Sequence, residues 1–175
     1  MAKDVIDNLS HDQALSILRR LANGDPAVRK KIEAETERLQ PTVDVEAVCE
    51  DVFSELDGID VHDLWDRSGS TRDGYNDPSE LSWEMFDERL EPFLDEVFKL
   101  LKMGTVERAR LCCMGVLKGL RRYERESQSE FKDWAPDAAA DRFSALLERW
   151  RKKVGDDKEM EAFVKRECVK WNGVV

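Results

Sequence analysis

The amino-acid sequence predicts an all-α fold, in which seven or eight helices pair as antiparallel hairpins and stack as a bundle with no β-sheet. Apolar residues recur at intervals of three and four along most of the chain, which is the spacing of one helix face. No stretch of four or more residues alternates between apolar and polar side chains, as a half-buried strand would. Charged residues make up 38% of the chain, above the usual ~25%, and helices accommodate this excess because each turn exposes several positions to water.

The first two helices have clear signals at their ends. Ser10 and Gln13 are typical of a capping box, because the hydroxyl and the amide each satisfy a free backbone N–H. Gly24 ends the first helix, and Asp25 with the proline after it begins the second, which ends before Pro41. The expected apolar faces consist of Ala14, Leu15, Leu18, Leu21 and Ala22, and of Val28, Ile32 and Leu39.

A third helix is predicted after Asp44, and its apolar face is the most regular in the chain. Gly58 marks its end. A short helix over residues 61–67 is also indicated, and residues 68–78 are expected to form a loop because they are rich in Ser, Gly, Asp and Asn. The face of the third helix follows the i, i+3, i+4, i+7 pattern through Val45, Val48, Cys49, Val52, Phe53 and Leu56.

The middle of the chain predicts an antiparallel hairpin of two long helices. The first of them begins at Ser79 or Ser82, and Pro92 inside it is expected to kink or interrupt it. Residues 103–105 form a tight turn, in which Thr105 is expected to cap the second helix. This pair is the best-supported supersecondary element of the sequence.

The C-terminal part begins with a polar connector over residues 124–135, in which Phe131 and Trp134 are the expected anchors to the core. A further helix follows Asp137 and ends at Gly155. A last helix is predicted after it. The apolar faces of these two helices are expected to contain Ala138, Phe143, Leu146, Leu147, Trp150 and Val154, and Met160, Phe163, Val164, Cys168 and Trp171.

A chain of 175 residues suits one continuous domain. We expect a helical-hairpin domain over residues 1–135 and a C-terminal helical pair over residues 136–175 that packs on it. The N-terminus has no apolar run of seven or more residues, and nothing approaches the ~18 apolar residues of a membrane span. A cytoplasmic protein without a membrane partner is therefore expected.

The net charge of −10 is unevenly distributed. Residues 33–96 contain 21 acidic and 4 basic side chains, whereas both flanking regions are slightly basic. A negative field repels phosphate backbones, which disfavours nucleic-acid binding by the whole chain. The asymmetry fits a basic protein partner or head-to-tail contact between copies, so a homo-oligomer stays open. Solvated helix faces are the simpler explanation and the favoured one.

The order of signals in the first two thirds of the chain resembles the helical region of SWIM-type zinc-finger proteins. Residues 14–18, followed by Asp25-Pro26-Ala27-Val28-Arg29-Lys30-Lys31-Ile32, are similar to a leucine-rich helix and D-P-x-[LV]-R-x-x-[LI] hairpin of that family, and residues 94–105 are similar to the TPR-like hairpin after it. The zinc ligands of the family, C-x-C and C-x-H, have no counterpart near His11 or His62. The resemblance therefore implies a TPR/HEAT-like interaction region without its zinc finger.

The cysteines predict neither a metal site nor a disulfide framework. Cys112 and Cys113 are adjacent on one helix and so point about 100° apart, which is poor for shared ligation. No CxxC pair exists, so we expect reduced and mostly buried thiols, with no metal and no cofactor. Gly115 and Gly119, four residues apart on that helix, are expected to let a neighbouring backbone approach closely.

Residues 62–77 carry the most chemically varied side chains. His62, Asp66, Arg67 and Tyr75 would supply a base, an acid and an anion-binding group if they met in a cleft. No known catalytic spacing is present, and turn chemistry alone explains the composition. No catalytic residue is therefore assigned, and an enzyme that uses this loop is kept as an alternative. As an interaction loop, the candidate residues are Trp65, Arg67, Arg72 and Tyr75.

Two basic clusters are the other candidate sites. One consists of Lys118, Arg121, Arg122 and Arg125, and the other of Arg149, Arg151, Lys152 and Lys153. A nucleic-acid accessory protein would need both clusters on one face. The function predicted from the sequence is a protein-interaction or scaffold module of helical-repeat type, because stacked hairpins leave a groove or a flat face suited to a peptide or helix.

Overall fold

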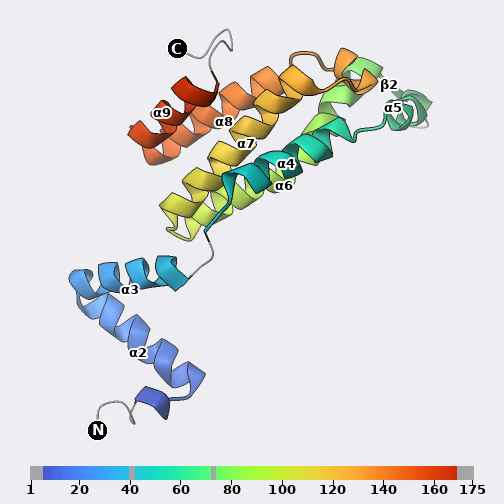
Figure 1. The fold of residues 1–175 in the computed structure, drawn as a ribbon. Helices are drawn as coiled ribbons and strands as arrows, with labels where there is room; N and C mark the ends of the chain where they lie inside the picture. Colours follow the sequence, from blue (N-terminus) through green and yellow to red (C-terminus); the bar gives the residue numbers. More distant parts are fainter. Residues whose placement is uncertain (1–5, 40–41, 72–73, 169–175) are drawn as a thin grey trace. The chain divides into compact units, whose positions relative to one another are not determined.

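In a computed structural model of the chain, the described residues (6–39, 42–71 and 74–168) form eight α-helices, a short 3-10 helix and one two-stranded sheet (Figure 1). The prediction of a mostly helical fold is thereby confirmed. The chain divides into two compact units, residues 1–42 and residues 43–175. The boundary suggested near residue 136 falls inside the second unit, where α8 (Ala138–Val154) packs on α7 (Val106–Glu126).

Among its described residues, the first unit has two long helices, α2 (His11–Gly24) and α3 (Pro26–Leu39), which contact each other. Its capping signals are confirmed, since Ser10 and Gln13 form the full capping box and the carboxylate of Asp25 accepts a hydrogen bond of 2.8 Å from the Ala27 N–H. The helices meet at the turn between them and diverge toward their other ends (Figure 1). No side chain of α2 is buried.

The second unit is built around α7. Helices α4 (Val45–Asp57) and α6 (Pro78–Lys102) lie on one side of it, and α8 and α9 (Lys158–Glu167) lie on the other (Figure 1). Ten residues of α7 are buried, which is more than in any other described helix. The largest fully buried side chains of this core are Trp150, Tyr123, Phe86, Phe131 and Phe143.

Close contact between α4 and α7 depends on the two glycines that the sequence singled out. A Cβ atom added at Gly115 would lie 2.5 Å from the Cβ of Val48, and one added at Gly119 would lie 2.6 Å from the Cβ of Val52. Real Cβ atoms do not approach so closely, so only glycine allows α4 to rest on α7 at this distance. The expected close approach is confirmed.

Helix α6 is one helix from Pro78 to Lys102, so of the kink or break expected at Pro92 the break does not occur, and the kink stays a prediction. Pro92 removes one backbone hydrogen bond, but its position is exposed, so water can satisfy the carbonyl that loses its donor. The helix begins earlier than predicted because Asp77 caps it, accepting a hydrogen bond of 2.8 Å from the Ser79 N–H. Thr105 makes no capping bond to α7.

The expectation of no sheet is also wrong. Strands β1 (Gly69–Thr71) and β2 (Gly74–Asn76) pair antiparallel, with Ser70 opposite Tyr75. Strands of three residues are too short to show an alternating pattern in the sequence. The hairpin follows α5 (Val61–Arg67), the short helix that the sequence indicated.

Helix α9 is held to the core by a charged network around Asp157. The carboxylate caps the helix through the Met160 N–H (3.2 Å) and accepts hydrogen bonds from Trp150 Nε1 (3.2 Å) and Arg110 Nε (2.9 Å). The Asp157 side chain is only 5% exposed. Burial raises the pKa of this carboxyl, but the hydrogen bonds, above all that from Arg110, lower the pKa by more, and the net result is a lowered pKa.

We predict that Gly115→Ala and Gly119→Ala each lower the free energy of unfolding by ~1–3 kcal/mol, because the added methyl group forces α4 away from α7. Urea titration followed by circular dichroism measures this change. Gly24→Ala is the control, since nothing lies within 4 Å of its added Cβ. Equal behaviour of all three variants would contradict the close-contact interpretation.

A second prediction concerns pH. Because the native pKa of Asp157 is lowered, the carboxylate contributes stability above its ordinary pKa of about 3.8, and this contribution is lost as the pH falls through the native pKa. Asp157→Asn should therefore lower the free energy of unfolding by about 2 kcal/mol at pH 7. The difference from the unmodified chain should shrink as the pH falls below 3.8 and through the lowered native pKa, as urea titrations at several pH values would show. A difference that stays constant with pH would contradict this role.

Candidate functional site

A groove at one end of the second unit is the strongest candidate for a binding site. It is a cavity of about 410 Å³ between the C-terminal end of α6, the N-terminal end of α7 and the C-terminal end of α8. Its volume falls in the usual range for ligand pockets, ~300–1,000 Å³. The residues that line it are Phe98, Leu101, Lys102, Val106, Arg149, Lys153 and Val154.

The groove combines an apolar floor with a basic rim. Phe98 is buried, and the guanidinium of Arg149 lies 3.6 Å from the centre of its ring. This cation–π contact holds the arginine beside the groove. Leu101 and Val154 are half-buried, and Val106 is 37% exposed. Apolar surface is thus accessible directly beside cationic side chains.

Lys102, Arg149 and Lys153 form no ion pair within the described part of the chain. Lysines near the C-terminal ends of α6 and α8 are stabilised there by the helix dipole. That effect does not neutralise them toward a ligand, and Arg149 lies one turn further from the helix end. The groove therefore presents three uncompensated positive charges around an apolar floor.

The chemistry of the lining suits binding rather than reaction. Its seven residues include no carboxylate, imidazole, thiol or hydroxyl, so the amines of Lys102 and Lys153 have no proton-transfer partner of those kinds among the lining residues. An apolar group could enter and contact Phe98 and Leu101, while a carboxylate or phosphate attached to it meets the three cations. The groove thus favours an amphipathic anion.

The predicted interaction loop is partly fixed to the fold. Trp65 packs edge-to-face against Trp134, with ring centres 4.7 Å apart, which supports an anchoring role. Arg67 makes a two-pronged ion pair with Glu88, at 3.0 and 3.1 Å, and the hydrogen bonds from Arg67 lower the pKa of Glu88. Tyr75 is 68% exposed. Arg72 lies outside the described residues.

The positions of these side chains also concern the alternative of an enzyme that uses residues 62–77. His62 and Asp66 are both exposed on α5, as Tyr75 is on β2, and the backbone N–H of His62 donates to the capping carboxylate of Asp60. Arg67 is committed to Glu88. The described surface has cavities of about 410, 100 and 320 Å³. None of them is lined by His62, Asp66, Arg67 or Tyr75.

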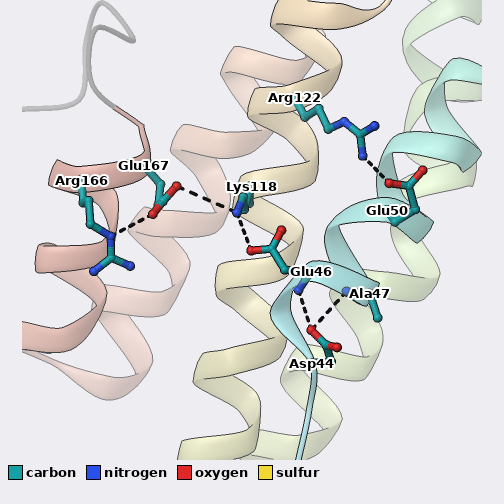
Figure 2. A network of polar contacts seen from close by, with 8 residues as sticks. All are labelled: Asp44, Glu46, Ala47, Glu50, Lys118, Arg122, Arg166 and Glu167. Atoms are coloured by element: carbon teal, nitrogen blue, oxygen red, sulfur yellow. Dashed lines mark hydrogen bonds and ion pairs between the residues drawn. The ribbon is translucent and has the colours of Figure 1, made fainter.

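The first basic cluster is used within the fold. Figure 2 shows Lys118 of α7 between Glu46 of α4 and Glu167 of α9, and Arg122 one turn along paired with Glu50. The hydrogen bond to Glu46 raises the pKa of Lys118. These ion pairs hold two helices to α7 and neutralise the cations that a nucleic acid would need. Of the other two members of the cluster, Arg121 is half-buried and Arg125 is exposed.

Sequence reasoning found only part of the groove. Arg149 and Lys153 belong to the second predicted basic cluster, but Phe98, Lys102 and Val106 were not singled out. A usable signal exists in the sequence: Phe98 and Lys102 are four residues apart, as are Arg149 and Lys153, so each pair lies on one helix face. Nothing in the sequence shows that these two faces meet.

All four cysteines are free and buried, as expected. Burial raises the pKa of Cys112 and of Cys168 to about 11, and it raises the pKa of Cys113 well above its ordinary value of 9.0. No group of three or more His, Cys, Asp or Glu side chains that could hold a metal ion occurs among the described residues.

Comparisons with protein-family models, with curated proteins and with solved structures found no match to this chain. The resemblance to SWIM-type proteins therefore stays a prediction. Among the described helices, none is both long enough and apolar enough to cross a lipid bilayer.

We predict that the four thiols react slowly in the native protein. With a pKa of about 11, on the order of 0.1% of Cys112 is thiolate at pH 8. Labelling with 5,5′-dithiobis(2-nitrobenzoic acid) should be at least ~100-fold slower than in urea, where all four thiols are accessible. Rapid labelling of Cys112 or Cys113 without denaturant would contradict their burial.

Proposed function

We propose that this protein is a protein-interaction module and that the groove between α6, α7 and α8 binds an acidic segment of a partner protein with an apolar anchor. The observation that carries the proposal is the combination of three cations, Lys102, Arg149 and Lys153, that pair with no described carboxylate, with an accessible apolar floor. Acidic peptides with a Leu or Phe side chain match both features.

The arrangement of the helices supports this use. Helices α6 and α7 form a hairpin, with α4 and α8 on its sides. Helical-repeat scaffolds are built from stacked hairpins and bind partners on their concave surfaces, and the α6–α7 hairpin supports a use of that type. The proposal therefore includes a helical-repeat type of recognition, with the groove as its binding surface.

The expected charge of the partner depends on which charged side chains of this protein are not already engaged in internal ion pairs. The acidic stretch over residues 33–96 favours a basic partner, but several of its carboxylates are engaged inside the protein. Glu46, Glu50, Glu55, Asp87 and Glu88 all pair with cations of the same chain. The cations of the groove have no such partners among the residues that the structure describes, so an acidic segment gains more from binding there.

The test is a binding measurement with a defined probe. A fluorescent synthetic peptide of about 15 residues, with Leu and Phe flanked by Glu, should bind the full chain, and its affinity should fall as salt is added. Lys102→Glu and Lys153→Glu should each weaken binding by about tenfold or more, because each replaces an attraction by a repulsion. Fluorescence anisotropy measures the affinity.

Lys152→Glu is the matched control. Lys152 is adjacent to Lys153 and undergoes the same change of charge, but it pairs with Glu148 and does not line the groove. Its variant should bind within about twofold of the unmodified chain. Equal losses for Lys152→Glu and Lys153→Glu would show attraction to overall charge only and would contradict a specific groove.

A further inference from the structure

The helical hairpin of the first unit lacks a core of its own. No described side chain of α2 or α3 is buried, although α2 has a regular apolar face. Leu18 is 43% exposed and Leu21 is 48% exposed, one turn apart on that face. Isolated helices shorter than ~12–15 residues are marginal in water, and units below ~40 residues usually need further support. The hairpin therefore requires something to cover its apolar face.

The charges of the hairpin are separated along its length. The turn end, residues 19–31, carries five cations and one carboxylate, and the open end, residues 6–18 and 32–36, carries four carboxylates and no Lys or Arg. The cations of the turn end form no ion pair with another described residue, and Arg29 donates only to the neutral amide of Asn23. The cations are Arg19, Arg20, Arg29, Lys30 and Lys31, and the carboxylates of the open end are Asp7, Asp12, Glu33 and Glu35.

This charge pattern selects the occupant. The two ends carry +4 and −4, so residues 6–36 are neutral as a whole. A uniformly acidic or uniformly basic partner would be attracted at one end and repelled at the other. A second copy of the same hairpin, turned end for end, meets opposite charge at both ends.

We propose that α2 and α3 pair antiparallel with α2 and α3 of a second copy, so that the first unit dimerises as a four-helix bundle. A two-fold axis perpendicular to the hairpin brings the turn end of each copy against the open end of the other. Leu18 lies near the middle of α2, so this axis passes close to Leu18 and places the apolar faces in contact. A parallel arrangement would bring +4 against +4.

The proposal predicts a dimer of the full chain, measured by sedimentation equilibrium over micromolar to submillimolar concentrations. The double variant Leu18→Glu/Leu21→Glu should raise the dissociation constant by about 100-fold or more, because it places charges in the apolar contact. Met103→Glu is the matched control: Met103 is 58% exposed, but it lies in the second unit, and this variant should stay dimeric.

Charge reversal tests the orientation. A turn-end variant, Arg29→Glu/Lys30→Glu/Lys31→Glu, and an open-end variant, Asp7→Lys/Asp12→Lys/Glu33→Lys, should each be largely monomeric in low salt. Their equimolar mixture should form a heterodimer, because the reversed ends then complement each other. In a parallel dimer, the two turn ends face each other. Reversing their charge would replace a contact between positive ends by one between negative ends, so the turn-end variant would not lose a favourable contact.

The opposite results are equally clear. A chain that is monomeric at all concentrations in low salt would overturn the proposal. A dimer that survives Leu18→Glu/Leu21→Glu but dissociates with Met103→Glu would place the contact in the second unit and overturn it too. A turn-end variant that dimerises as well as the unmodified chain would overturn the antiparallel arrangement.

Discussion

The contact of α4 with α7 across Gly115 and Gly119 is the constraint on which the second unit depends. It brings two backbones close together, with Val48 and Val52 filling the space that larger side chains would occupy. One face of α7 is thereby committed to α4, and its other faces receive α6, α8 and α9. The groove lies where three of these helices end, so its shape follows from how α6 and α8 pack against α7.

Cations serve two different purposes in this unit. Lys118 and Arg122 face carboxylates of α4 and α9, and their ion pairs add to the apolar contact that already holds those helices (Figure 2). Surface pairs of this kind contribute little stability individually, typically below ~1 kcal/mol, but they remove charge from the surface. Lys102 and Lys153 have no such partners in the described part of the chain, and the proposed function makes use of their charges. Under the proposed function, the local pairing of charges, rather than the net charge of −10, decides which ligand the groove attracts.

The two units differ in how much of their apolar surface they bury. The second unit buries large side chains such as Trp150 and Tyr123 completely within its own helices. The first has α2 and α3 as its two long described helices, and one pair of amphipathic helices cannot enclose both of its apolar faces. A groove that binds a partner and a hairpin that pairs with another copy would together give a module with two binding sites per assembly, in which avidity strengthens otherwise weak contacts.

The sequence by itself determined the local structure. Ser10, Asp25 and Asp44 start helices as expected, because a capping side chain needs only the backbone two or three residues away, and the periodic apolar residues identified nearly every helix. Only the tertiary structure decided what depends on distant neighbours. Pro92 stays inside a continuous helix, and Thr105 donates a hydrogen bond to the Leu100 carbonyl rather than capping α7. The meeting of Phe98 with Arg149 joins residues 51 positions apart, and no local pattern encodes which helix faces pack together.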